Sequence, residues 1–164
     1  MAVDSSVIGK PTSRSVVAVE RGAVSNFARG VKDDNAIYHD ARAATAAGFA
    51  AIPAPPTFTF AMGYWGAYPE LSADLEKLEG NPMFEIIGKL MANGGLVLHG
   101  EQEFIYHRPP MVGDVLHGEG TCVDAYEKES KGKVMTFVVS ETVWSDKSTG
   151  EPVVTERFNL IHRR

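Results

Sequence analysis

The residues best suited to chemistry lie between Asp33 and Asp40, where the chain reads DDNAIYHD. This segment holds carboxylates, an amide, a phenol and an imidazole, directly ahead of a long apolar stretch. Adding or removing water across a carbon–carbon bond needs such groups beside an apolar slot. One group moves the proton on the carbon next to a carbonyl, and another handles the water. We therefore take Asp33, Asn35 and His39 as candidate catalytic residues and Tyr38 as a candidate substrate contact.

The same segment also suits a purely structural role. Asp34 and Asp40 are good caps for turns, Asn35 accepts a tight backbone angle, and Tyr38 can pack against a core. Composition alone favours this structural interpretation. The catalytic interpretation needs support from other parts of the chain.

No charged residue occurs between Arg42 and Glu70. Within this stretch, residues 56–68 predict a helix that is apolar on nearly every face, and such a helix must be covered by other elements. A transmembrane helix would need about 20 consecutive apolar residues. Prolines at 53, 55 and 56 interrupt the stretch, and the apolar run after them is too short to span a bilayer. We predict a helix buried in protein and no membrane span.

The start of this predicted helix is a candidate binding surface. The first N–H groups of a helix have no partner within it and lie at the positive end of its dipole. The N–H groups of Thr57 and Phe58 are therefore candidate donors to a carbonyl oxygen on which negative charge develops. Together with Pro56, Phe60 and Tyr38, these residues make up the predicted substrate-binding set.

The second half of the chain reads as strands. Four segments rich in β-branched and aromatic residues are separated by short turn signals, which predicts antiparallel neighbours: 96–107, 115–126, 134–144 and 153–162. Before them come a short extended run at 16–19, helices over 20–31 and 41–47, the apolar helix, and an excursion over about 70–95 with helices at 71–78 and 83–91. Four long strands around one apolar helix form the hot-dog arrangement. We expect a single α+β hot-dog domain over residues 1–164. Because such domains leave a sheet edge uncovered, we also expect a dimer.

Composition narrows the possible partners and cofactors. The chain has 164 residues, a net charge of −5 and no basic cluster, so nucleic acid and anionic membranes are poor candidate partners. The lone Cys122 cannot form an internal disulfide, and the N-terminus lacks the apolar core of a signal peptide, which favours a cytoplasmic location. The five histidines show no metal-ligand spacing, and nucleotide-binding motifs are absent. We therefore predict no metal and no cofactor.

Three motifs together resemble the MaoC-like hydratase/dehydratase family, whose motif is D-x-N-P-[IL]-H in a hot-dog domain. Residues 33–38 read D-D-N-A-I-Y, residues 54–58 read A-P-P-T-F, and residues 106–114 read Y-H-R-P-P-M-V-G-D. The likeness extends from residue 7 to residue 162, apart from the 70–95 excursion. It implies hydration of 2-enoyl thioesters, or dehydration of (3R)-3-hydroxyacyl thioesters, carried by coenzyme A or acyl carrier protein. In the family an aspartate and a histidine share the acid–base work, and the acyl chain lies along the central helix.

The chain departs from the family motif where the histidine belongs. Tyr38 occupies that position and Ala36 replaces the proline. A phenol with a pKa near ~10 is a poor base at neutral pH. Asp34 and His39 repeat the spacing of Asp33 and Tyr38, so a one-residue shift in the turn would bring His39 into the site. An extended backbone would instead point it away from Tyr38, and we favour that arrangement.

This A-x-Y variant resembles the substrate-binding subunits of heterodimeric (3R)-hydroxyacyl carrier-protein dehydratases from mycobacterial fatty-acid elongation. There, a separate hot-dog subunit carries the aspartate and histidine. The resemblance leaves two hypotheses: an enzyme of the hydro-lyase class, either by itself or as a subunit, or a non-catalytic acyl-binding subunit that needs a catalytic hot-dog partner. The dimer is accordingly either a homodimer or a heterodimer. A hot-dog thioesterase would share the fold but not the motif. In either hypothesis, the apolar residues of the excursion would widen or cover an acyl channel.

Overall fold

The computed structural model describes residues 3–130 and 132–164. Its strands are β1 (Pro11–Ala18), β2 (Leu96–Tyr106), β3 (Val115–Ser130), β4 (Lys133–Asp146) and β5 (Pro152–Arg163). Its α-helices are α1 (Arg21–Gly30), α2 (Ala41–Ala46), α3 (Phe58–Ala61), α4 (Gly63–Gly66) and α5 (Pro82–Met91). Short 3₁₀ helices occur at η1 (Ser5–Val7), η2 (Ala36–Tyr38) and η3 (Pro69–Ser72).

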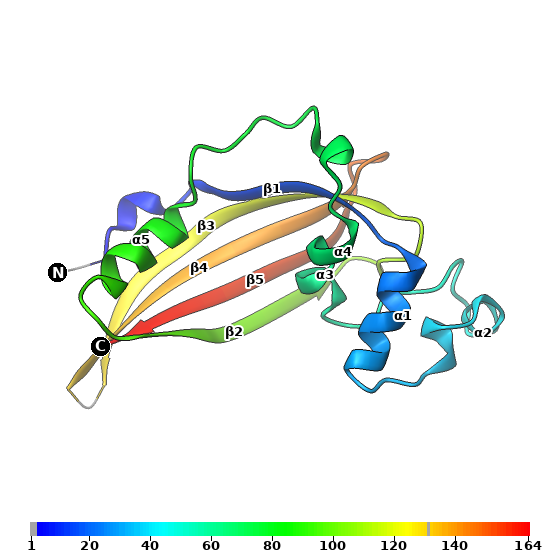
Figure 1. Ribbon diagram of the computed structural model, residues 1–164, viewed down its shortest axis with the longest axis horizontal. Helices are drawn as coiled ribbons and strands as arrows, with labels where there is room; N and C mark the ends of the chain where they lie inside the picture. Colours follow the sequence, from blue (N-terminus) through cyan, green and yellow to red (C-terminus); the bar gives the residue numbers. More distant parts are fainter. Residues whose placement is uncertain (1–2, 131) are drawn as a thin grey trace.

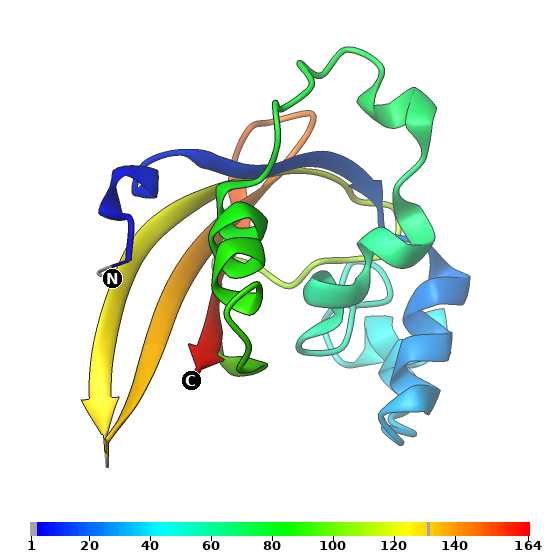
Figure 2. The same ribbon diagram turned by 60° about the vertical axis from the view of Figure 1, so that its left-hand side comes forward.

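The five strands form one antiparallel sheet in the order β1-β3-β4-β5-β2. The sheet is curved, and α3, α4 and α5 lie on its concave side (Figures 1 and 2). The predicted α+β hot-dog fold is thereby confirmed, with all four long strands in place. The first strand is longer than the predicted run at 16–19, because it pairs with β3 from Pro11 onward. A proline is tolerated at the first residue of an edge strand.

The central apolar helix is shorter than predicted. Instead of one helix over 56–68, two four-residue helices follow each other. Gly63 and Gly66 weaken helical continuity. Gly66 also packs directly against the carbonyl of Ala18 in β1, where a side chain would not fit. A short helix held this closely to a strand end is buried on one side only.

The burial of this segment is accordingly uneven. Phe58 is 1% exposed, whereas Phe60 is 45% and Tyr64 86% exposed. The expectation that the helix is wrapped on all sides is therefore wrong. One side packs on the sheet, and the other presents aromatic side chains outward.

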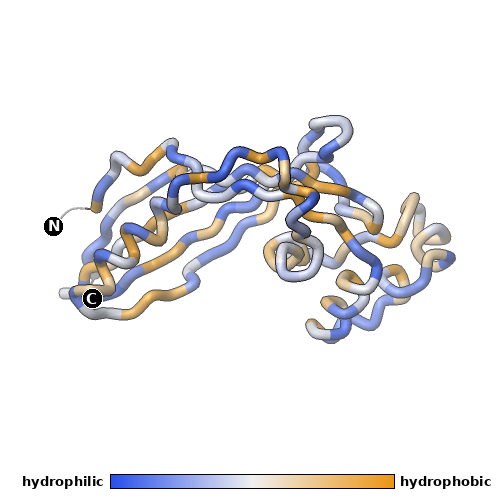
Figure 3. Tube along the Cα trace, turned by 45° about the horizontal axis from the view of Figure 1, so that its top comes forward, coloured by the Kyte–Doolittle hydropathy of each residue, from blue (hydrophilic) through white to orange (hydrophobic). Residues whose placement is uncertain are grey.

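The concave face of the sheet carries two separate cores. At one end, Phe58 and Met62 pack against Leu116, Trp144 and Val154. At the other end, α5 covers a second cluster that includes Ile86, Ile87, Val138 and Leu160. The apolar residues Met83, Ile86 and Ile87 of α5 are buried in this cluster with residues of the strands. Apolar and polar stretches alternate along the strands in Figure 3.

The excursion between the two ends is only partly helical. The predicted helix at 83–91 is confirmed as α5, and the Asn81 side chain caps it by accepting the Met83 N–H at 2.9 Å. The predicted helix at 71–78 is wrong, because only the 3₁₀ helix η3 forms there. Such a short segment gains little helix stability unless it packs on an apolar face, and Leu71, Leu75 and Leu78 are only half-buried. No helix in the described ranges is long and apolar enough to cross a membrane.

Candidate functional site

The side chains of Asp33 and Asn35 each accept a backbone N–H from the residue two positions further along the chain. The Asp33 carboxylate accepts the Asn35 N–H at 3.1 Å, and the Asn35 side-chain oxygen accepts the Ile37 N–H at 3.2 Å. Asp40 caps α2 in the same way, accepting the Arg42 N–H at 2.6 Å. These bonds hold the chain in the tight η2 turn. The structural interpretation is therefore confirmed for Asn35 and Asp40, whereas the carboxylate that closes the turn is that of Asp33 and not the predicted Asp34.

Tyr38 and His39 leave this turn in different directions. Tyr38 is buried, with 8% of its surface exposed. The His39 ring instead turns to α1, where its Nδ1 lies 2.8 Å from the Ser25 hydroxyl, and Arg21 donates to the His39 carbonyl at 3.1 Å. The one-residue shift that would carry His39 into the place of Tyr38 does not occur.

Tyr38 lines a small apolar cavity of about 190 Å³. The cavity lies where the η2 turn, the proline-rich approach to α3 and the end of β2 meet. It is lined by Ile37, Tyr38, Phe49, Pro53, Ala54, Pro56, Tyr106, Pro109 and Pro110. Its only side-chain polar groups are therefore two phenols, those of Tyr38 and Tyr106.

The backbone N–H groups at the start of α3 already have acceptors. The Thr57 N–H donates to the Tyr106 hydroxyl oxygen at 3.1 Å, and the Phe58 N–H donates to the Pro55 carbonyl at 3.1 Å. The prediction that these groups are free is therefore wrong. Thr57 has a φ of +68°, in the left-handed region, which is uncommon for a threonine. This backbone turn directs its N–H at the phenol.

Phe60, also predicted as a substrate contact, faces away from the cavity. Its ring lies 5.4 Å from the His99 ring and 5.6 Å from the Phe158 ring, measured between centroids. Of the predicted site residues, Tyr38 and Pro56 line the cavity, Asp33 and Thr57 adjoin its lining residues, and His39 and Phe60 point elsewhere. Their roles in binding or catalysis stay predictions.

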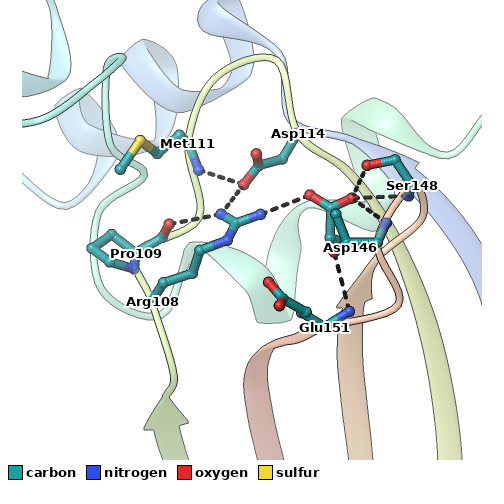
Figure 4. Close-up of polar contacts among 8 residues, drawn as sticks. Arg108, Pro109, Met111, Asp114, Asp146, Ser148 and Glu151 are labelled. Atoms are coloured by element: carbon teal, nitrogen blue, oxygen red, sulfur yellow. Dashed lines mark hydrogen bonds and ion pairs between the residues drawn. The ribbon is translucent and has the colours of Figure 1, made fainter.

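The R-P-P-M-V-G-D segment takes part in an ion-pair cluster, which we call the clamp, formed by Arg108, Asp114 and Asp146 (Figure 4). Arg108 binds the Asp114 carboxylate at 2.6 Å and the Asp146 carboxylate at 2.9 Å. Asp114 also accepts the Met111 N–H at 2.9 Å, which closes the loop. The clamp ties the β2–β3 connection to the β4–β5 turn. It thereby fixes the two prolines, at 109 and 110, that line the cavity.

Sequence reasoning missed one buried acid near this site. Glu156 on β5 lies directly opposite Phe104 of β2, and it is only 6% exposed. Burial raises its pKa to about 6, while the neighbouring Thr59 hydroxyl and Trp144 indole act to lower it. The sequence carried a signal: Glu156 falls in the same alternating phase as the apolar Val154 and Phe158.

The phenols of the cavity are kept protonated by their surroundings. Burial raises the pKa of Tyr38, and the charge of Asp33 raises it further. Burial also raises the pKa of Tyr106; the bond from Thr57 lowers it, and the charge of Glu156 raises it. At neutral pH both tyrosines are therefore hydrogen-bond donors rather than bases. Within residues 3–130 and 132–164, no three His, Cys, Asp or Glu side chains converge as a metal site would require.

Solved structures share the fold of this chain. The ChsH1–ChsH2 complex of Mycobacterium tuberculosis superposes with a TM-score of 0.73 and 23% identity, over 93% of this chain and 83% of that one. The HadBC (3R-hydroxyacyl-ACP dehydratase) complex of M. tuberculosis gives a TM-score of 0.67 and 20% identity, over 94% and 96%. The fold is that of the MaoC-like hot-dog dehydratases.

Sequence comparison identifies the family. A family model described as "FAS1-like, dehydratase domain region" matches residues 6–156. A UPF0336 protein of Streptomyces avermitilis is 32% identical over 171 residues, covering 99% of this chain and 97% of the relative. The chain therefore belongs to the FAS1-like dehydratase-domain family, among its UPF0336 members.

Proposed function

We propose that this protein is the acyl-thioester-binding subunit of a (3R)-3-hydroxyacyl-thioester dehydratase, and that a second hot-dog chain supplies the catalytic aspartate and histidine. The single observation that carries the proposal is that Tyr38, not an imidazole, lines the cavity. His39 is bound to Ser25 on the far side of the turn. No imidazole or carboxylate is among the residues that line the cavity, and the buried Glu156 lies outside this lining, so the chain can hold a thioester but lacks, at the cavity wall, a group that moves the proton.

The apolar surfaces of the chain support an acyl ligand. The cavity at Tyr38 is mostly apolar, and a second cavity of about 600 Å³ lies at the other end of the sheet, beside α5. The lining of this second cavity is mixed, with apolar residues such as Ile86 and Leu90 beside charged and polar ones such as Lys89 and His162. Small-molecule sites typically combine apolar walls with few polar groups, and the cavity at Tyr38 fits this description better. The carrier is coenzyme A or acyl carrier protein, and the acyl chain is the part the subunit holds.

A partner chain has a suitable place to bind. β2 lies at the edge of the sheet and pairs only with β5. An uncovered edge offers a row of unpaired backbone groups to another strand. Leu96 and Ile105 are exposed on this strand. A heterodimer through β2 is the arrangement we propose. A homodimer would be expected if the chain were active by itself.

The other hypothesis, a self-sufficient hydro-lyase, rests on one observation. Asp33 lies close enough to Tyr38 for its charge to raise the phenol's pKa. A carboxylate is therefore near the cavity, although it is occupied by the Asn35 N–H. The single-domain organisation and a cytoplasmic location stay predictions from the sequence.

Binding of a saturated acyl-coenzyme A, which cannot be hydrated, tests the proposal. We expect the purified chain to bind it, and Ile37→Trp, which fills the cavity, to weaken binding by about tenfold or more. Val31→Trp is the matched control, because it makes a similar change at an exposed position outside the cavity. Equal affinity in the wild type and Ile37→Trp would overturn this site as the place of binding.

A further inference from the structure

Glu156 is a buried acid whose Oε1 atom has no hydrogen-bond partner of good geometry in the described part of the chain. Its Oε1 atom, the Thr59 hydroxyl and the Trp144 indole nitrogen are all buried, and none of them has a partner with hydrogen-bond geometry in the described part of the chain. Yet the hydroxyl and the indole lie close enough to the carboxyl to act on it as hydrogen-bond donors, which lowers its pKa. Buried polar atoms without partners are rare and call for a reason.

Strand register places Glu156 next to Tyr106. Tyr106 pairs with Val154, and Phe104 pairs with Glu156. Residues directly opposite each other share a face, so Tyr106 and Glu156 are diagonal neighbours on the same side of the sheet. The Phe104 and Tyr106 rings are stacked with centroids 6.1 Å apart, which fixes the tyrosine ring.

Residues at the start of α3 lie next to both Glu156 and Tyr106. Thr59 lies beside Glu156, and two residues earlier the Thr57 N–H donates to the Tyr106 hydroxyl. Since that hydroxyl oxygen accepts the Thr57 N–H, its own proton can point elsewhere. Tyr106 lines the cavity, so the open direction for its proton is the cavity itself.

We propose that Tyr106 is the hydrogen-bond donor to the thioester carbonyl, and that Glu156 is the positioning residue that holds this phenol and α3 in place. The proposal rests on the proposed function for the identity of the ligand. The sequence predicted the Thr57 and Phe58 N–H groups as donors to the carbonyl. The proposed donor is instead the Tyr106 hydroxyl, which the Thr57 N–H orients. The negative charge of Glu156 also disfavours the phenolate, so Tyr106 keeps the proton that it donates.

An experiment without ligand tests the pairing of the two residues. Tyrosine labelled with ¹³C at Cζ reports the ionisation of each phenol by NMR, and Tyr106→Phe assigns its signal. We expect the Tyr106 pKa to fall in Glu156→Gln, which removes the charge but keeps the shape of the side chain. An unchanged Tyr106 pKa in a folded Glu156→Gln variant would overturn the positioning role.

Binding of the same saturated acyl-coenzyme A tests the donor role. We expect Tyr106→Phe to weaken binding by roughly 2- to 12-fold, the range for one hydrogen bond. Tyr126→Phe is the matched control, because Tyr126 stacks on Phe137 outside the cavity. Full affinity in Tyr106→Phe, with loss in Ile37→Trp, would overturn the donor role and leave the proposed function standing. If the wild type binds no acyl-coenzyme A, with or without a partner chain, the proposed function and the donor role both fail.

Discussion

The 33–40 turn and the β5 strand both bring an acid close to the cavity phenols, but they use it differently. In the turn, Asp33 accepts a backbone N–H two residues away. On β5, the backbone groups around Glu156 serve the sheet ladder, and the carboxyl, with its Oε1 atom unpartnered, has only the Thr59 and Trp144 side chains as neighbouring donors. Short turns offer free N–H groups to nearby carboxylates, whereas strands do not. An acid in a motif-like turn is therefore weaker support for chemistry than an acid buried on a strand.

The largest effect should come from removing the buried ring of α3. Phe58→Ala deletes a buried ring of α3 that packs edge-on to Phe27, with centroids 5.4 Å apart, and we expect a loss of about 3–5 kcal/mol in the free energy of unfolding. Urea denaturation followed by circular dichroism measures it. Phe60→Ala is the matched control on the exposed side and should cost about 1 kcal/mol or less. Similar losses in both variants would mean that α3 is not buried on one side only.

In contrast to Glu156, the acids of the clamp, Asp114 and Asp146, are paired with a cation, Arg108. Arg108→Ala leaves two half-buried carboxylates, Asp114 and Asp146, without their cation, and we expect a loss of about 2–3 kcal/mol. The exposed Arg157, which pairs with Glu141 and Glu103, is the control, and Arg157→Ala should change stability little. Thermal or urea unfolding compares the two. An equal effect of both substitutions would contradict a structural role specific to the clamp.

The buried Glu156 should make stability depend on pH. Because the pKa of Glu156 is raised from 4.5 to about 6 on folding, its contribution is fully present below about pH 4.5 and is lost as the pH rises through 6. The loss amounts to about 2 kcal/mol above pH 7. Unfolding free energies of Glu156→Gln should therefore decline less than those of the wild type between pH 4.5 and 8. If the unfolding free energies of the two proteins changed in parallel with pH, folding would not raise the pKa of Glu156, and the prediction would be wrong.

The smallest effect is expected in the turn. Asp33→Ala removes one bond to the Asn35 N–H at a partly exposed position, and we expect a loss of about 0.5–1 kcal/mol. Asp33→Asn, which keeps an acceptor oxygen, should be closer to the wild type. Urea unfolding of the three proteins gives the order. A loss several times larger in Asp33→Ala would indicate that this carboxylate does more than close the turn.

The fold was largely predictable because its strands carry long, regular patterns. The four segments from Leu96 onward are amphipathic or apolar over ten or more residues, and the turns between them hold Gly, Pro and charged residues. The central helix was predicted too long, because hydropathy alone does not show that Gly66 must touch Ala18. That contact depends on tertiary packing, which local sequence patterns do not contain.

The site was only partly predictable for a related reason. Tyr38 and Pro56 were found because they lie in recognisable motifs. Glu156 was missed because it stands alone in a strand, and its link to Tyr106 exists only through strand register. The direction of His39 depends on the η2 turn and on Ser25 of α1. The spacing of the residues alone allowed His39 to point either into the site or away from Tyr38.

A hydration assay of the purified chain with trans-2-enoyl-coenzyme A tests the central claim most directly. Loss of the enoyl-thioester absorbance reports turnover, first with the chain alone and then with a hot-dog chain that carries D-x-N-P-x-H. We predict no turnover alone and turnover when the partner is added. Turnover by the chain alone, abolished in His39→Ala, would contradict the account and identify His39 as the base.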